Sequence, residues 1–275
     1  QRYLEFLAAE AVPFYAAFKL DAAPLLAAPT PEAATTGKDS VYHLLRQRVV
    51  RAHKNGTTSE YVHECVRILT DAGARAFASY ALPHYRGEQR ARLLACTVHK
   101  ADGSKEEPRL RGGDVALPSL RPGDTVEIEG RIDDLAPTFF GDYFGLVHFF
   151  SAPDGTAVHR AELVVVAEPG REYRYQLANG APEPQIGNTD DGAKTFAFRL
   201  EDVARDVVEI WRPEPRERAP LVRFSTFGDW SAFANWWWNL IRGQIETTEP
   251  MRQRVLELCQ GLTTPAQKID AIYRF

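Results

Sequence analysis

The residues of this sequence that are suited to nucleophilic or metal chemistry are its three cysteines and seven histidines. His63 and Cys65 lie two positions apart in an extended stretch, so both side chains project from one face, a spacing that two metal ligands use. The sequence offers no second His or Cys pair with this spacing to complete a metal site, because Cys96 and His99 fall on opposite faces of their stretch. We therefore favour a cross-strand pair inside a sheet and predict no metal or cofactor site.

Cys259 is the thiol closest in context to a helix. A cysteine nucleophile is activated at a helix N-terminus or by a neighbouring base. Cys259 instead stands near the C-terminal end of a predicted helix, in VLELCQGL, where burial and the helix dipole both disfavour a thiolate. We predict a structural thiol and assign no catalytic residue; the alternative is a cysteine hydrolase that uses Cys259 with His148.

Two groups of acidic residues are also candidates for chemistry. Glu127 and Glu129 alternate with apolar residues, which predicts a solvated sheet face and not a pair of catalytic carboxylates. The acids of NTDDG, residues 188–192, lack the distant bidentate glutamate of a calcium loop. They predict a hairpin turn between REYRYQL and KTFAFRL.

The stretch FFGDYFGLVHFF, residues 139–150, is the most suggestive binding surface because it gathers aromatic side chains around two glycines. Such a segment binds a ligand or partner, or it closes one end of a sandwich or packs on another element; we favour the packing role. The candidate surface residues are Phe139, Phe140, Tyr143, Phe144, Phe149 and Phe150.

The sequence predicts that most of these candidate residues lie on or beside β-strands. Asn55-Gly56 and Asp102-Gly103 each separate two extended runs, which predicts β-hairpins. Residues 163–166 are apolar on both faces, as in a central strand. Several short strands between turn signals predict an antiparallel β-sandwich over about residues 40–210, with an open barrel as the alternative.

Four of the five tryptophans cluster in TFGDWSAFANWWWNLI, residues 226–241. Their spacing predicts an amphipathic helix with Trp230 and Trp237 on the apolar arc, hence in a core. A membrane-surface helix or a sugar platform is less favoured, because the polar face lacks cations and nothing holds the rings exposed. Two further helices follow, the second opened by a Thr264/Gln267 capping box.

The composition limits the classes of function. The chain is 44% hydrophobic and 25% charged with a net charge of −4, which is typical of a globular protein. We predict no membrane span, since no apolar run reaches about 18 residues, and no nucleic-acid binding, since the basic residues form no stripe.

The domain organisation follows from these patterns. We predict an N-terminal helical or linker segment over 1–37, a β-sandwich domain over 38–212, and a connector with helices over 213–275. One or two short helices are expected within 2–20. The fold class is mainly β, with an N-terminal helical segment and C-terminal helices.

Ordered phrases over some two hundred residues carry a family resemblance. The chain resembles a bacterial domain of unknown function in the phrases KNGTTSEYVHECVRILTDAGARAFASYALPHY, then LRPGDTVEIEGRIDD, then FFGDYFGLVHFFSAPDGTAVHRAELVVVAEPG, then LVRFSTFGDWSAFANWW. That domain stands immediately before a transglutaminase-like, papain-related thiol core in large exported or surface proteins. The resemblance runs from about residue 38 to the end.

The resemblance implies a non-catalytic accessory or recognition module joined to the entry helices of a thiol core. The core's catalytic Cys, His and Asp are expected beyond residue 275, so none is assigned to a position in this chain. The implied partner is that downstream core, with a protein or cell-wall polymer as a further partner. The implied location is periplasmic or at the cell surface. A glycan- or peptide-binding sandwich that uses residues 139–150 is the remaining alternative.

Overall fold

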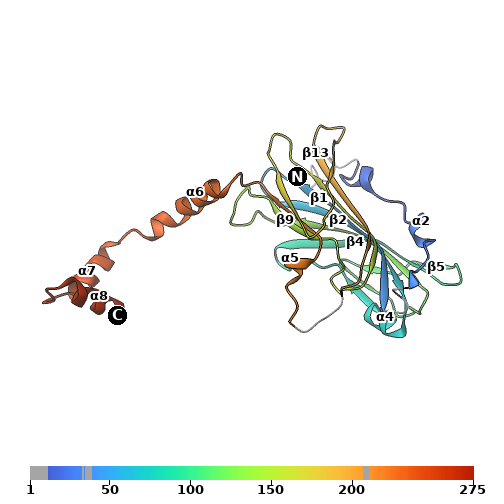
Figure 1. Cartoon of the computed structure of the whole chain (residues 1–275), viewed down its shortest axis with the longest axis horizontal. Coiled ribbons are helices and arrows are strands. Elements are labelled where there is room, and N and C mark those ends of the chain that lie inside the picture. Colours follow the sequence, from blue (N-terminus) through green and yellow to red (C-terminus); the bar gives the residue numbers. More distant parts are fainter. Residues whose placement is uncertain (1–11, 33, 35–38, 207–210) are drawn as a thin grey trace. The chain divides into compact units, whose positions relative to one another are not determined.

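The computed structural model describes residues 12–32, 34, 39–206 and 211–275 (Figure 1). It divides into two compact units, Gln1–Thr226 and Phe227–Phe275, each of which is described by itself. The first unit is mainly β and the second is helical, which confirms the predicted fold class.

An eight-stranded sheet is the frame of the first unit. Neighbouring strands are antiparallel, except that β1 and β10 run parallel. The strand order is β12 (Gln185–Asn188), β13 (Lys194–Val203), β10 (Val158–Val166), β1 (Val41–Ala52), β2 (Thr58–Ile68), β8 (Thr125–Asp134), β4 (Gln89–His99) and β5 (Lys105–Glu106).

Both predicted hairpins are present. The β1–β2 turn places Gly56 at φ +82°, and the Gly56 amide donates to the His53 carbonyl over 2.9 Å. Gly103 takes φ +87° in the β4–β5 turn. Glycine suits both positions because a side chain disfavours positive φ. The strand that contains 163–166 is central, between β1 and β13, as expected.

Two small sheets cover one face of the large one and complete the sandwich. The sheet of β11 (Arg174–Ala178), β14 (Leu221–Ser225) and β9 (Gly145–Phe149) packs Tyr175 and Phe224 against Phe196 and Phe198. The sheet of β3 (Ser79–Ala81), β7 (Asp114–Ala116) and β6 (Leu110–Arg111) packs with α4 (Asp71–Ala76) on β2, β8 and β4.

Two details of strand pairing differ from the prediction. β11 lies in a small sheet, so the turn at 188–192 joins β12 to β13 and not REYRYQL to KTFAFRL. The first unit also extends past residue 212, through α5 (Pro215–Arg218), because β14 pairs with both β11 and β9. Pairings between strands distant in sequence decide both points.

The N-terminal segment covers the opposite face of the large sheet. One or two helices are expected within 2–20, but residues 2–11 of this range lie outside the described residues. The described part, 12–20, contains only the 3-10 helix η1 (Ala16–Phe18). α2 (Ala23–Leu26) follows and buries Leu25 against Leu44 and neighbours. The segment hugs the sheet, so the side chains of this face are shielded from water.

The second unit consists of α6 (Trp230–Ile241), η2 (Arg242–Gln244), α7 (Glu249–Leu258) and α8 (Pro265–Tyr273). The Asp229 side chain caps α6 by accepting from the Ala232 amide over 2.7 Å. The predicted capping box of Thr264 and Gln267 is present at α8. Of the helices in the described residues, none has the length and apolar character needed to cross a bilayer.

Within the second unit by itself, Trp230 and Trp237 are not enclosed in the core that their spacing predicts. Trp230 is 84% exposed and Trp237 is 44% exposed, and none of the three α-helices buries a residue. Three short helices with one apolar stripe each do not enclose a core. The spacing of apolar residues identifies the apolar side of the helix, but it does not specify which element packs against that side.

Candidate functional site

The predicted aromatic surface is divided between core and exterior. Phe144 and Phe150 are buried and join the core beneath the β11-β14-β9 sheet. Phe140, Tyr143 and Phe149 are half-buried, and Phe139 is 65% exposed. The favoured packing role therefore accounts for most of these rings. The alternation that organises the stretch is that of β9, which the sequence pattern did not reveal.

The same segment closes over the β1–β2 turn. A Cβ at Gly56 would lie 2.7 Å from the carbonyl oxygens of Gly141 and Tyr143. The Phe144 amide donates to Thr226 Oγ1 over 2.9 Å, which fixes the other end of the segment. Residues 139–144 thus seal one end of the sandwich.

A cluster of His63, Cys65, Glu127 and His99 lies on the face that the N-terminal segment covers. It spans three neighbouring strands, because β8 lies between β2 and β4. Cys65 faces Glu127 directly across the β2–β8 pair. His63 Nε2 lies 3.0 Å from one Glu127 oxygen and 3.9 Å from Cys65 Sγ, and His99 Nε2 lies 2.8 Å from the other oxygen.

The cluster is largely buried, and burial and hydrogen bonding together set the pKa values of its groups. His63 and Cys65 are fully buried, and the Glu127 side chain is 20% exposed. The hydrogen bond with His63, opposed by burial and reinforced by the bond with His99, lowers the pKa of Glu127 to about 2. Burial raises the pKa of the Cys65 thiol far above its usual range. Glu127 is thus a carboxylate and Cys65 a thiol at neutral pH.

This arrangement is not a catalytic relay. In a thiol or serine triad the two ring nitrogens of histidine serve different partners, the nucleophile on one side and the acid on the other. Here Nε2 of His63 faces both Cys65 and Glu127, while the buried Nδ1 has no hydrogen-bond partner in the described part of the chain. Three potential ligand atoms that converge on one point are typical of a metal site. The hydrogen bonds of the cluster also join β2, β8 and β4.

The prediction of a solvated face at Glu127 and Glu129 is wrong. The Glu129 side chain is 14% exposed, accepts from the Tyr61 hydroxyl over 2.9 Å and pairs with Lys19 at 2.8 Å. Lys19 belongs to the N-terminal segment, so the covering segment and the strand share this contact. Alternation finds the two faces of a strand but not which one is covered.

The other predicted thiols and the proposed base lie apart from this cluster. Cys96 points to the opposite face, and burial raises its pKa to about 11. Cys259 is the half-buried C-cap of α7, the opposite end to the one that activates a thiol. His148 is buried in the first unit, and burial holds its pKa well below the usual range.

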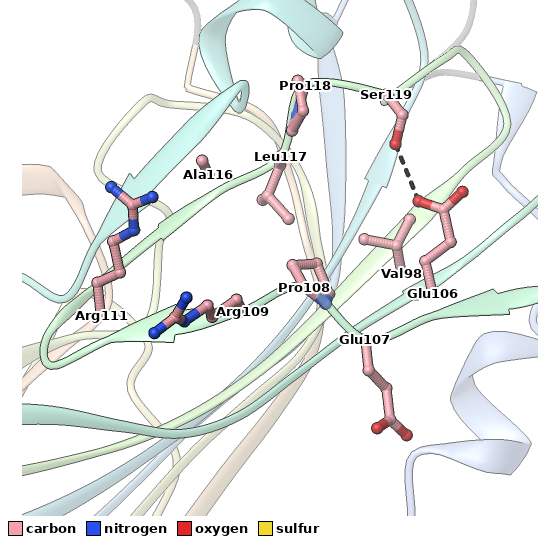
Figure 2. A pocket seen from close by; sticks show the side chains of 10 residues that line it. All are labelled: Val98, Glu106, Glu107, Pro108, Arg109, Arg111, Ala116, Leu117, Pro118 and Ser119. Atoms are coloured by element: carbon pink, nitrogen blue, oxygen red, sulfur yellow. Dashed lines mark hydrogen bonds between the residues drawn. The ribbon is translucent and has the colours of Figure 1, made fainter.

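Two grooves on the first unit contain charged side chains. The one in Figure 2, of about 390 Å³, holds Glu106, which accepts from Ser119 Oγ over 2.9 Å, while the Glu107 carboxylate points away. A second, of about 580 Å³, is lined by several arginines and His148. Its arginines already pair with acids, as Arg212 does with Asp206 at 2.8 Å.

Sequence reasoning considered His99 and Glu127 but did not place them beside His63 and Cys65. The signal lay in the strand order: once β8 is placed beside β2, the register brings Glu127 opposite Cys65. Placing β4 on the other side of β8 then brings His99 within reach. Neither neighbour relation is encoded in the local pattern.

Comparison with known proteins bears on part of this chain. Residues 111–206 match the model of a family described as a domain of unknown function with a solved structure (DUF3857). This segment is a domain of unknown function. It contains every strand from β7 to β13, hence Glu127 but not the other residues of the cluster. No curated protein matches the chain.

One solved structure shares the fold, and a second is more distant. A protein of Parabacteroides distasonis described as a candidate protease is 12% identical, with a TM-score of 0.65 over 86% of this chain and 49% of its own. The chain thus spans about half the length of that protein. An M1 zinc metallopeptidase of Deinococcus radiodurans is 11% identical over 68% of this chain and 42% of its own, with a TM-score of 0.36. At these identities the first likeness shows the fold alone, and the second supports no argument.

Proposed function

We propose that this chain is a non-catalytic β-sandwich module that serves as an accessory or recognition domain for a transglutaminase-like thiol core in the same polypeptide. The state of the thiols carries the proposal. Cys65 and Cys96 are buried with raised pKa values, and the unit that holds Cys259 contains no histidine. A thiolate with a base beside it, open to substrate, is therefore not assembled within either described unit.

The comparison with the candidate protease supports an accessory role. The likeness covers 49% of that chain, so the protein holds a further half outside the shared fold. We infer that the chemistry of a protein built in this way belongs to that half. The resemblance noted from the sequence favours a transglutaminase-like core and a periplasmic or cell-surface location.

The recognition surface of the module lies at the exposed end of the aromatic segment. Phe139 is exposed, and a groove of about 540 Å³ nearby is lined by Tyr143, Val147 and Tyr175, among others. β9 is one of the two edge strands of its sheet, and Val147 on it is 51% exposed. An apolar edge strand suits an extended peptide that pairs with it, so a protein segment is the favoured partner over a cell-wall polymer.

Thiol labelling separates the accessory role from the alternative of a cysteine hydrolase. In the folded chain at neutral pH we expect Cys65 and Cys96 to resist an alkylating reagent until denaturant is added, and we expect no amide or ester hydrolysis. Rapid alkylation of Cys259 together with turnover that Cys259→Ser abolishes would overturn the proposal. Cys96→Ser is the matched control for loss of an unrelated thiol.

The sequence of the complete polypeptide tests the second half of the proposal. A Cys, then a His, then an Asp in the order of a thiol core, after residue 275, would support it. A complete polypeptide without such a core would overturn it.

Binding measurements test the surface. Peptide libraries and cell-wall polymers are offered to the chain and to a Phe139→Ser/Val147→Ser variant that retains its circular dichroism. We expect the variant to lose at least tenfold in affinity for a captured peptide. Tyr85→Ser, which changes a residue that is 73% exposed elsewhere, is the control and should bind normally. Equal binding by all three proteins would exclude this surface.

A further inference from the structure

The donors His63, Cys65 and Glu127 converge on one point of the large sheet. Their side chains share a face because His63 and Cys65 are two residues apart and Cys65 is in register with Glu127. The three ligand atoms all lie within 4.8 Å of one another. An imidazole nitrogen, a thiol sulfur and a carboxylate oxygen form a mixed set that zinc and its first-row neighbours accept.

The two separations that involve His63 are close to those around a coordinated ion. With metal–nitrogen bonds of about 2.0 Å and metal–sulfur bonds of about 2.3 Å, tetrahedral geometry places donors about 3.2–3.7 Å apart. His63 Nε2 is 3.0 Å from Glu127 Oε1 and 3.9 Å from Cys65 Sγ. The third pair, Cys65 Sγ and the Glu127 oxygen, is separated by no more than 4.8 Å. All three side chains have rotatable bonds, so they can draw together around one ion.

His99 occupies the place of a positioning residue. Its Nε2 lies 2.8 Å from the Glu127 oxygen that does not face His63. Metal-ligating carboxylates are commonly held in this way by a second hydrogen bond, which fixes their orientation. Glu127 is therefore held from β4 while it faces the donors of β2.

Charge and access also suit a divalent cation. A thiolate at Cys65 and the carboxylate of Glu127 together balance a charge of +2, so the buried site would be neutral. Glu129, in register with His63 on β8, adds a further carboxylate nearby. The Glu127 and His99 side chains are 20% and 16% exposed, which gives an ion a route from solvent.

We propose that His63, Cys65 and Glu127 bind one zinc-class divalent ion, with His99 positioning the carboxylate and the fourth coordination place left to water. Binding releases the Cys65 proton to solvent and forms the metal–sulfur bond without any change of oxidation state. The ion would join β2 to β8 and stabilise the sandwich. The site does not depend on the proposed accessory function, since it needs neither a downstream core nor a partner.

Cobalt substitution is the direct test. The full chain is stripped with a chelator and titrated with Co²⁺, which reports a bound thiolate by a near-ultraviolet charge-transfer absorption. We expect saturation at one equivalent, displacement by Zn²⁺, and a melting temperature that rises on addition of Zn²⁺.

Matched variants locate the ion. Cys65→Ser should abolish the thiolate absorption, whereas Cys96→Ser and Cys259→Ser should retain it. Glu127→Gln, which keeps the side-chain shape, should weaken Co²⁺ binding more than tenfold, and His99→Gln by about 10–100-fold. Folding of each variant is checked by circular dichroism. Absence of a one-equivalent thiolate absorption in the wild type, or its persistence in Cys65→Ser, would overturn the proposal.

Discussion

Tyr15 stacks on Tyr61, with ring centroids 4.1 Å apart and ring planes 7° from parallel. Tyr61 belongs to β2 and is fully buried, so this contact fastens the N-terminal segment to the face that carries the His63 cluster. The Gln47 side-chain amide donates to the Phe18 carbonyl over 2.8 Å and adds a second attachment. The N-terminal segment therefore packs on this face of the large sheet as part of the first unit.

Loss of the Tyr15 ring should destabilise the first unit. We expect Tyr15→Ala to lower the free energy of unfolding by about 1–2 kcal/mol, because the variant loses the stacking and part of the apolar burial. Urea denaturation monitored by circular dichroism measures the change. Val12→Ala, at a residue that is 72% exposed, should change it by less than about 0.5 kcal/mol. Equal stabilities of the two variants would contradict the role of the cover.

The turn under the aromatic segment should tolerate no side chain. Gly56→Ala meets two carbonyl oxygens at 2.7 Å in addition to the strain of φ +82°, whereas Gly87→Ala has φ +86° and nothing within 4 Å. Positive φ alone costs about 1–2 kcal/mol for a non-glycine residue. We expect Gly56→Ala to lose clearly more stability than Gly87→Ala in thermal unfolding. Similar losses would mean that the segment yields to the added methyl group.

Acid should weaken the contact between Asp154 and His43. Burial raises the pKa of Asp154, but the hydrogen bonds from His43 and Thr156 outweigh it and hold that pKa below 3.8. A carboxyl depressed in this way stabilises the fold above its unfolded pKa and loses that contribution as pH falls through the folded pKa.

We therefore expect the free energy of unfolding to decline below about pH 4, the ordinary aspartate range, and Asp154→Asn to flatten this decline. Denaturation series at successive pH values measure it. Asp190→Asn, at an exposed turn position, should leave the slope unchanged. A steeper decline in Asp154→Asn would show that the hydrogen bonds do not outweigh burial.

Fluorescence and circular dichroism should report different events. All tryptophans except Trp211 lie in the second unit, and Trp211 and Trp230 are 97% and 84% exposed. We expect long-wavelength emission in the native chain and little change of it across the urea transition that the sheet signal shows. One coincident transition with a large red shift would contradict the exposure of these rings.

The sequence by itself determined the features that neighbouring residues decide. Gly56 and Gly103 predicted the hairpins because positive φ is a local requirement, and Thr264 with Gln267 predicted a helix start because a cap reaches only three residues. Alternation also found several of the strands and their two faces, although not β9.

The tertiary structure decided which of those faces meet. The parallel pairing of β1 with β10, and the placement of β8 between β2 and β4, join segments far apart in the chain. Those pairings bring Glu127 to Cys65 and His99, and the N-terminal segment makes that face an interior one. Local propensity carries no information about such contacts, because they gain their free energy only when the whole sheet has assembled.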